Sequence, residues 1–388
     1  MFKITKFAAA LSLAAAVLAG AACGWQKPPQ PTDEIRIGGN LELTGGSSLF
    51  GQSIHKGLKL AFKEVNGKGG INGRKVILIV ADNKSEAPEA ANATVKLIAQ
   101  DKVSAIVGPA TSSPVLACAS IVTERKIPLL TPSGTNENIT FLDGKTRDFL
   151  FRGCFIDPLQ GEIMAKFALN NLNLRKMAIY SDISSDYAKK LAAAYRSEFE
   201  KKGGQIVAEE AYQQKDTDFR PVLTKIRAAG PEGIFVPGYY QEVGTIIKQA
   251  REFGITMPLL GSDGWDSPKI LELAGAAALN NTYFCDHYSV EDLDPNIQKF
   301  VKNYKAEYNG ETPDAFAALG YDSGLIVADA VRRAGGGDPE KIRDALAATK
   351  DLQVATGKLT MDARHNPIKG AVIIAMQDGK QVFKEKIN

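Results

Sequence analysis

The sequence predicts an α/β protein of two lobes, each with a parallel β-sheet that carries helices on both faces. Two observations support this fold class. Short apolar strands alternate with helical patterns in two successive series, which is typical of parallel sheets covered by helices. Residues 23–388 also exceed twice the length of an average domain of about 150 residues, so two domains are expected.

The first series begins with an apolar strand at 34–39, and apolar residues then recur at helical spacing between 54 and 65. The Gly-rich segment 66–73 leads into a strand at 76–80. A phosphate-binding loop would follow a strand and open a helix, whereas this segment follows a helix, so we interpret it as a reverse turn. The remaining elements expected in this series are a helix at 86–101, a strand at 103–107, a helix at 113–125 and a strand at 127–131.

The second series begins after the apolar stretch 149–156. An acid stands before a proline at Asp157-Pro158, and again at Asp294-Pro295 further along, which indicates an N-capped helix start in both places. The elements expected in this series are helices at 158–172, 186–202, 219–228 and 241–253, and strands at 177–180, 206–211, 233–236 and 258–261.

The last third of the chain contains long helical patterns at 295–308, 313–334 and 339–348, followed by strands at 372–376 and 382–384. Three helices with so little strand do not form a sheet domain of their own, so we expect them to pack on the first lobe. The chain would then pass several times between the lobes. Such a connection is a hinge beside a cleft, where two-lobed α/β proteins bind ligands.

The first 33 residues have the pattern of an export signal and a tether. Two lysines precede an apolar run that ends in small residues, which predicts a signal peptide at 1–22. The small residues before Cys23 are similar to the lipobox of bacterial lipoproteins, although Gly20 stands where a larger aliphatic residue is usual. We expect lipidation of Cys23, with ordinary signal-peptidase cleavage as the alternative, and a Pro-rich tether at 23–33. The expected location is the periplasm, with the membrane contacted only through the lipid.

Composition and charge exclude several classes of function. The formal net charge is +3, and it falls to +1 once Lys3 and Lys6 leave with the signal peptide, so no nucleic-acid-binding surface is expected. The four cysteines and three histidines lack metal-ligand spacing, and hydrolase motifs are absent. We therefore expect no metal, no cofactor and no enzymatic activity. We interpret His287, the one histidine that follows an acid, as a solvated loop residue.

Two small, hydroxyl-rich turns follow neighbouring strands of the first series. One contains Ser112 and Ser113, either of which can cap the next helix, and the other contains Ser133 and Thr135. Because the carboxyl ends of parallel strands meet at one edge of a sheet, the turns should lie side by side and offer N–H groups and hydroxyls to a small carboxylate. Taken singly, either turn could serve only as a helix cap.

The strand ends of the second series bring aromatic and acidic residues instead. They carry Tyr187, Tyr239, Asp263 and Trp265. An α-amino acid needs N–H donors for its carboxylate, a carboxylate for its ammonium group and apolar walls for its side chain, so the two sets of turns supply complementary parts. The alternatives are that Asp263 is only a turn acid beside glycines and that Trp265 only packs in the core.

The order and spacing of these segments resemble the leucine/isoleucine/valine-binding protein family, the amino-acid receptors of ABC importers. The resemblance covers nearly the whole chain after the signal peptide. The segments that carry it are Leu43 to Gly45 with Phe50-Gly51, Ala61 to Gly73, Gly108 to Pro114, Thr131 to Thr135, Phe151 to Gly161, Phe235 to Gly244 and Gly261 to Trp265.

The resemblance implies a type I periplasmic binding protein with two Rossmann-like lobes joined by three crossings. Lobe 1 would comprise 34–153 and 286–371, and lobe 2 would comprise 154–285 and 372–388. A monomeric receptor would close on an amino acid, preferably a branched-chain one, and deliver it to an inner-membrane ABC permease. The alternatives are another small carboxylate or amide, a sensory role, or an exported α/β enzyme.

The resemblance also implies roles for individual residues. Ser112 and Thr135 would bind the α-carboxylate, and the carbonyl of Ser133 and the carboxylate of Asp263 would bind the ammonium group. The remaining expected pocket residues are Tyr187 and Tyr239, which would close from the second lobe, together with Phe50 and Trp265. Phe50 stands where the family often has Tyr, and Asp263 where it can have Glu, which leaves the preferred side chain open.

Two cysteines would fall on the crossings that the resemblance implies. Cys154 would lie on the first and Cys285 on the second, which would make them neighbours in the hinge. A disulfide between them is possible in an oxidising periplasm, and two buried free thiols are the alternative.

Overall fold

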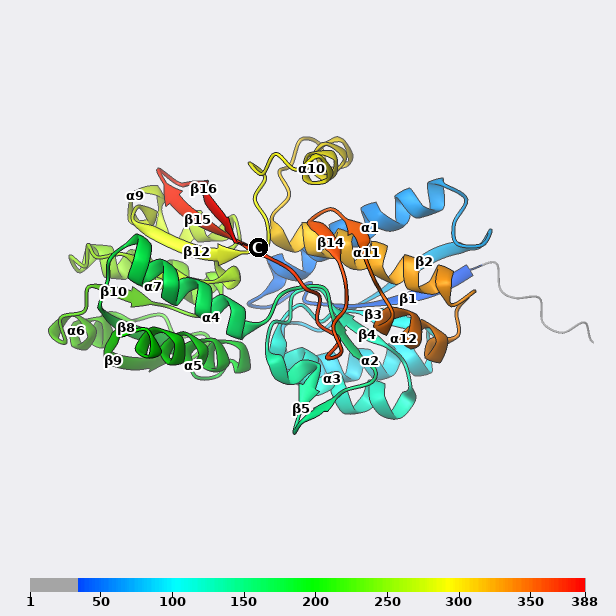
Figure 1. Cartoon of the computed structure of the whole chain (residues 1–388), viewed down its shortest axis with the longest axis horizontal. Coiled ribbons are helices and arrows are strands. Elements are labelled where there is room, and N and C mark those ends of the chain that lie inside the picture. The colour runs from blue at the N-terminus through cyan, green and yellow to red at the C-terminus, as the bar shows by residue number, and fades with distance from the viewer. Residues whose placement is uncertain (1–33, 388) are drawn as a thin grey trace, which may run out of the picture. The chain divides into compact units, whose positions relative to one another are not determined.

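The computed structural model describes residues 34–387, which contain two large β-sheets flanked by helices (Figure 1). The predicted signal peptide at 1–22, the tether at 23–33 and the lipidated Cys23 lie outside the described residues. Within the described part, no helix is both long and apolar enough to span a bilayer.

The first lobe is built on a five-stranded parallel sheet with the order β2-β1-β3-β4-β7. Its short strands β3 and β4 are fully buried, and β3 is apolar throughout, as expected for a parallel sheet with both faces covered. The strands are β1 (Glu34–Leu41), β2 (Lys75–Asp82), β3 (Ala105–Val107), β4 (Leu129–Thr131) and β7 (Leu150–Arg152). The helices that the chain places between these strands are α1 (Ser48–Gly67), α2 (Ala87–Ala99) and α3 (Ser112–Arg125).

The three long helices of the last third pack on this first lobe, as predicted. They are α10 (Pro295–Glu307), α11 (Ala315–Arg333) and α12 (Pro339–Ala347). Glycines bring α1 and α11 into backbone contact, because a Cβ atom on Gly57 would collide with the carbonyl of Ala317, and one on Gly320 with that of Ile54. Phe300 of α10 packs into a cluster with residues of both helices.

The second lobe is built on a seven-stranded sheet with the order β16-β15-β12-β11-β10-β8-β9, parallel except for β15 and β16. Its strands are β8 (Lys176–Asp182), β9 (Gln205–Tyr212), β10 (Gly233–Phe235), β11 (Leu259–Gly261), β12 (Thr282–Asp286), β15 (Ala371–Gln377) and β16 (Lys380–Ile387). Its helices are α4 (Asp157–Lys166) with a π-helical continuation (Phe167–Asn171), α5 (Asp186–Lys201), α6 (Arg220–Ala228), α7 (Tyr240–Glu252), α8 (Lys269–Ala274) and α9 (Ala276–Leu279).

The chain passes three times between the two lobes: after β7, after β12 and before β15. The third passage places the red strands β15 and β16 beside the yellow β12 in Figure 1. The predicted fold class, two sheet-and-helix lobes joined by three crossings, is therefore confirmed. The smaller elements are short 3-10 helices at Glu137–Ile139 and Asp263–Trp265 and two hairpins, β5 (Phe141–Leu142) with β6 (Lys145–Thr146) and β13 (Leu352–Val354) with β14 (Gly357–Leu359).

Several local predictions differ from the structure. β12 was not predicted. It has only five residues and follows two very short helices, so its sequence shows no clear hydrophobic period, and the strand is instead stabilised by pairing with β11 and the distant β15. Asp294 caps α10 by accepting from Asn296 N at 2.8 Å, as predicted. Asp157, in contrast, is the first residue of α4 and makes no cap bond, and α3 has Thr111 rather than Ser112 or Ser113 in the N-cap position.

Candidate functional site

A small cavity lies where the strand ends of the two sheets face each other, with about 210 Å³ of space between its atoms when the adjoining open solvent is included. Its walls come from both lobes, and they combine hydroxyl groups, aromatic rings and one carboxylate. The lining residues are Phe50, Ala110, Thr111, Ser112, Ser133, Tyr187, Tyr239, Asp263, Gly264 and Phe316. The structure thus brings together six of the predicted site residues, Phe50, Ser112, Ser133, Tyr187, Tyr239 and Asp263.

The first-lobe wall is the N-terminus of α3 with the neighbouring Ser133 turn. The first N–H groups of a helix have no acceptor within the helix, so the start of α3 at Ser112 and Ser113 offers donors to an anion. The two turns are joined, because Ser133 Oγ donates to Ala110 O at 2.8 Å and Asn136 N donates to Ser112 Oγ at 3.3 Å. The predicted side-by-side placement of the turns is therefore present.

Glu42, which the sequence analysis did not single out, holds the first of these turns. Its fully buried carboxylate accepts hydrogen bonds from Ala110 N at 3.0 Å, Thr111 N at 3.1 Å and Thr111 Oγ1 at 2.9 Å. Burial raises the pKa of Glu42, and these hydrogen bonds oppose that shift. The only sequence signal for this role was an acid directly after a buried strand.

Thr135 lies on the second turn and is buried, but it does not line the cavity. Its Oγ1 has no hydrogen-bond partner within residues 34–387, and neither do the two carboxylate oxygens of the fully buried Asp157. Burial raises the pKa of Asp157 to about 8. Arg152 stiffens the turn by donating to Gly134 O at 2.7 Å and to Asn136 O at 2.8 Å.

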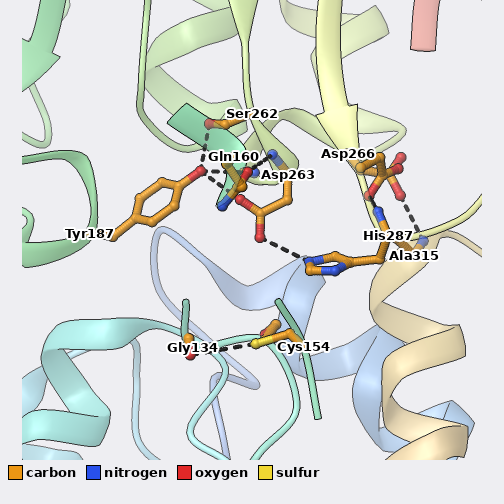
Figure 2. Close-up of polar contacts among 12 residues, drawn as sticks. Gly134, Cys154, Gln160, Tyr187, Ser262, Asp263, Asp266, His287 and Ala315 are labelled. Carbon is orange, nitrogen blue, oxygen red and sulfur yellow. Dashed lines mark hydrogen bonds and ion pairs between the residues drawn. The ribbon is translucent and has the colours of Figure 1, made fainter. Parts of the chain in front are cut away.

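The second-lobe wall centres on the carboxylate of Asp263, which is held from several sides (Figure 2). Tyr187 donates its hydroxyl to Asp263 Oδ1 at 2.6 Å, and His287 Nε2 lies 3.1 Å from Asp263 Oδ2. The backbone N of Asp263 donates to Gln160 Oε1 at 3.2 Å. Burial and the nearby Asp263 charge raise the pKa of Tyr187, so its hydroxyl remains a donor.

Aromatic rings close the cavity from both lobes. Tyr187 and Tyr239 stack with ring centroids 5.1 Å apart, and Phe50 stacks on Phe316 at 3.9 Å. Phe50 also meets Tyr239 edge-on at 5.7 Å, so the two pairs form one apolar wall. Phe316 was missed because it lies on α11, far from Phe50 in sequence, and its place depends on the helix packing at Gly57.

Two sequence interpretations need correction. His287 is not a solvated loop residue: its side chain is only 1% exposed and contacts Asp263. Trp265 is not among the residues that line the cavity; it is buried, and its indole Nε1 donates to Val236 O at 3.0 Å. The alternative of core packing therefore describes Trp265.

The three cysteines of the described residues, Cys118, Cys154 and Cys285, are buried free thiols. Cys154 Sγ contacts Gly134 O at 3.5 Å, which places it beside the Ser133 turn (Figure 2). Burial raises the pKa of Cys154 to about 12. The possible disulfide between Cys154 and Cys285 is absent from the structure, which has the alternative of two buried free thiols, and counting alkylatable thiols under non-reducing conditions tests this correction.

The polar groups that line the cavity are hydroxyls and one carboxylate. Among residues 34–387, no group of three or more His, Cys, Asp or Glu side chains is placed to hold a metal ion. The cavity instead offers helix N–H groups on one side and a carboxylate on the other.

Comparison with known proteins identifies the family. The profile of the "Periplasmic binding protein" family matches residues 34–381. The chain belongs to the periplasmic binding protein family. An "Amino acid binding protein" of Pseudomonas aeruginosa is 30% identical over 331 residues, which cover 85% of this chain and 87% of that protein.

Solved structures of periplasmic binding proteins show the same fold. The branched-chain amino acid substrate-binding protein LivJ of Streptococcus pneumoniae, solved with isoleucine, has a TM-score of 0.85 and 39% identity, covering 91% of this chain and 99% of that one. The leucine-binding protein LivK of Thermotoga maritima has a TM-score of 0.86 and 36% identity over the same shares. Membership of this family implies that the chain works outside the cytoplasm as a solute-binding protein.

Proposed function

We propose that the protein is the extracytoplasmic receptor of an ABC importer for an α-amino acid, with branched-chain amino acids as the preferred ligands. One observation carries the proposal. A group that binds an anion and a group that binds a cation line the same small cavity from opposite lobes. The N-terminus of α3 with the Ser112 hydroxyl faces from the first lobe, and the carboxylate of Asp263 faces from the second. A zwitterion bridges such walls, with its carboxylate at the helix and its ammonium group at the acid.

The lobes supply the remaining contacts for the zwitterion. Thr135, on the second turn beside Ser133, is a further donor to the ligand carboxylate in this proposal, and its hydroxyl also lies near enough to Asp157 to oppose the rise in the pKa of that carboxyl. The carbonyl of Ser133 is available beside it for the ammonium group. Because the ammonium group contacts both lobes, the bound ligand stabilises the closed arrangement of the lobes over an open one. The closed shape then distinguishes the ligand-bound protein from the ligand-free protein.

The aromatic walls support an apolar side chain. Phe50, Tyr239 and Phe316 are among the described residues that line the cavity, and Asp263 is the one charged residue among them. Rings that stack on one another leave a narrow apolar space, which suits an aliphatic group rather than a long or charged one. The relatives named for leucine and isoleucine agree with this choice.

The remaining parts of the proposal rest on the sequence. The pattern of residues 1–33 supports export and a lipid anchor at Cys23, which would keep a monomeric receptor close to the permease. The lobe division at 34–153 with 286–371 and 154–285 with 372–388 is part of the same proposal. The permease would recognise the closed, ligand-bound form.

Calorimetry with ligand-free mature protein tests the proposal. Leucine, isoleucine and valine should bind, and 4-methyl-2-oxopentanoate, which has the leucine side chain and carboxylate but no ammonium group, should bind much more weakly. Asp263→Asn should weaken leucine binding by about 2–5 kcal/mol, because the ammonium group would lose its buried partner. Asp351→Asn, at an exposed acid, is the matched control. Equal affinity for leucine and the oxo acid would refute an amino-acid site.

A further inference from the structure

We infer that His287 is a positioning residue of the ligand site: its imidazole fixes the carboxylate of Asp263 in the orientation that receives the ligand's ammonium group. This inference rests on the proposed function and adds to it a residue that does not line the cavity. His287 follows β12, on the second passage between the lobes, whereas Asp263 begins the short helix after β11.

The geometry gives Asp263 one neighbour for each oxygen. His287 Nε2 lies 3.1 Å from Oδ2, and the Tyr187 hydroxyl donates to Oδ1 at 2.6 Å (Figure 2). The side chains of Asp263 and His287 are 4% and 1% exposed, so water does not compete for either contact. Two donors on opposite oxygens fix the plane of a carboxylate, and a fixed plane aims the remaining lone pairs at one place.

The ring of His287 is itself held in place. It stacks on Phe155 with centroids 3.8 Å apart and planes 24° apart, and its backbone N donates to Asp286 Oδ1 at 2.7 Å. The other ring nitrogen, Nδ1, has no partner in the part of the chain that the structure describes. The contact with Asp263 is therefore the polar contact that orients the ring. Because the Asp263 carboxylate accepts this hydrogen bond, the neutral imidazole must carry its hydrogen on Nε2.

This arrangement connects the hinge to the ligand site. Phe155 lies on the first passage between the lobes and His287 on the second. Movement of these passages relative to each other would shift the imidazole and release the Asp263 carboxylate. A ligand ammonium bound to a correctly aimed Asp263 would in turn favour the hinge geometry in which His287 reaches it.

Charge explains why a neutral imidazole serves here. The charged groups that act on the ring are Asp263, Asp266 and Lys369, and the preceding residue, Asp286, accepts from the backbone N of His287. Burial is the largest influence and lowers the pKa of His287, and Lys369 acts in the same direction, while Asp263 and Asp266 oppose it. A neutral ring donates a hydrogen bond and leaves the Asp263 charge for the ligand. A protonated ring would compete with the ligand's ammonium group for the same carboxylate.

The experiment compares leucine affinity in the full mature protein with His287→Gln and His287→Leu. Glutamine retains an N–H donor, whereas leucine fills the space without one. We expect His287→Leu to weaken leucine binding at least tenfold at pH 7.5, and His287→Gln to remain within about threefold of the unmodified protein. His365→Asn is the control, because His365 is also buried and stacked on a phenylalanine, Phe151, but does not contact Asp263.

A pH series separates positioning from packing. Between pH 7.5 and 5, leucine affinity of the unmodified protein should fall more steeply than that of His287→Gln, because only the histidine can gain a competing charge. Equal losses in the Gln and Leu variants would overturn the inference, and if the Leu variant does not fold, a loss of more than about threefold in His287→Gln overturns it instead. If the unmodified protein binds no amino acid, the proposed function fails and this inference with it. If it binds leucine and His287→Leu is unchanged, only the inference fails.

Discussion

Ser113 and Asp186 exchange two hydrogen bonds across the cleft. Ser113 Oγ donates to Asp186 Oδ2 at 3.0 Å, and the backbone N of Asp186 donates back to Ser113 Oγ at 3.1 Å. Ser113 belongs to α3 of the first lobe and Asp186 to α5 of the second. Asn136 adds a third bond by donating to Asp186 O at 2.8 Å. These bonds join the lobes at the edge of the cavity and exist only when the lobes are close together.

Ser113→Ala should therefore weaken ligand binding without changing the cavity. Two partly exposed hydrogen bonds contribute about 0.5–1.5 kcal/mol each to the closed form and nothing to an open form, so we expect a loss of about tenfold in leucine affinity. Calorimetry measures the affinity, and Ser197→Ala, at an exposed position of α5, is the control. A lower melting temperature with unchanged affinity would show that the pair supports folding rather than closure.

Glu42→Gln should lower both stability and affinity. The carboxylate accepts from Ala110 N, Thr111 N and the Thr111 hydroxyl, whereas an amide would turn an N–H group toward one of these donors. Leaving a buried donor without an acceptor costs about 1–3 kcal/mol. Urea denaturation should show this loss, and Glu124→Gln, at an exposed position of α3, should show none. Unfolding curves that coincide would mean that the turn does not depend on the Glu42 charge.

Gly57→Ala should destabilise the first lobe through the contact between α1 and α11. The new methyl group would meet the carbonyl of Ala317, and separating the helices would also displace Phe316 from Phe50. Overpacking of this kind costs about 1–3 kcal/mol or more. Gly67→Ala is a matched control at the end of the same helix, where a Cβ atom has open space and alanine favours the helix. Chemical denaturation that ranks the two variants equally would contradict the packing argument.

The sequence predicted most of the polar residues that line the cavity, but not the residues that pack against them. Ser112 and Ser133 were predicted to lie side by side because they follow strands whose carboxyl ends share an edge of one sheet, and Asp263 was predicted to face them from a strand end of the second series. The placements of Phe316 and His287 depend on segments distant in sequence, α11 and the end of β12. No local period reveals those contacts.

The buried carboxyl groups show the same limit. An acid at a helix start before a proline indicates a cap, and the Asp294 cap follows this rule. Asp157 has the same local pattern, but its carboxylate is buried beneath the Ser133 turn, because the first passage between the lobes carries it inward. Only the tertiary structure distinguishes the two residues.

Asp157 should make the ligand-free protein less stable as the pH rises. Burial raises the pKa of Asp157 to about 8 in the folded chain, with the nearby Thr135 hydroxyl and Arg152 opposing the shift, while an unfolded aspartate titrates near pH 4. Between these values the folded chain binds more protons than the unfolded one. The stabilisation is therefore complete below about pH 4 and is lost as the pH rises to about 8, by at most about 1.4 kcal/mol per pH unit.

Asp157→Asn removes this titration while keeping the size of the side chain. The stability of the variant relative to the unmodified protein should therefore increase from pH 5 to pH 8, measured as the difference between their denaturation free energies at each pH. Taking the difference cancels the contribution of Asp314, whose pKa burial raises to about 7. Asp351→Asn should give a pH-independent difference. A pH-independent difference for Asp157→Asn as well would show that the pKa of Asp157 is not raised in the folded protein.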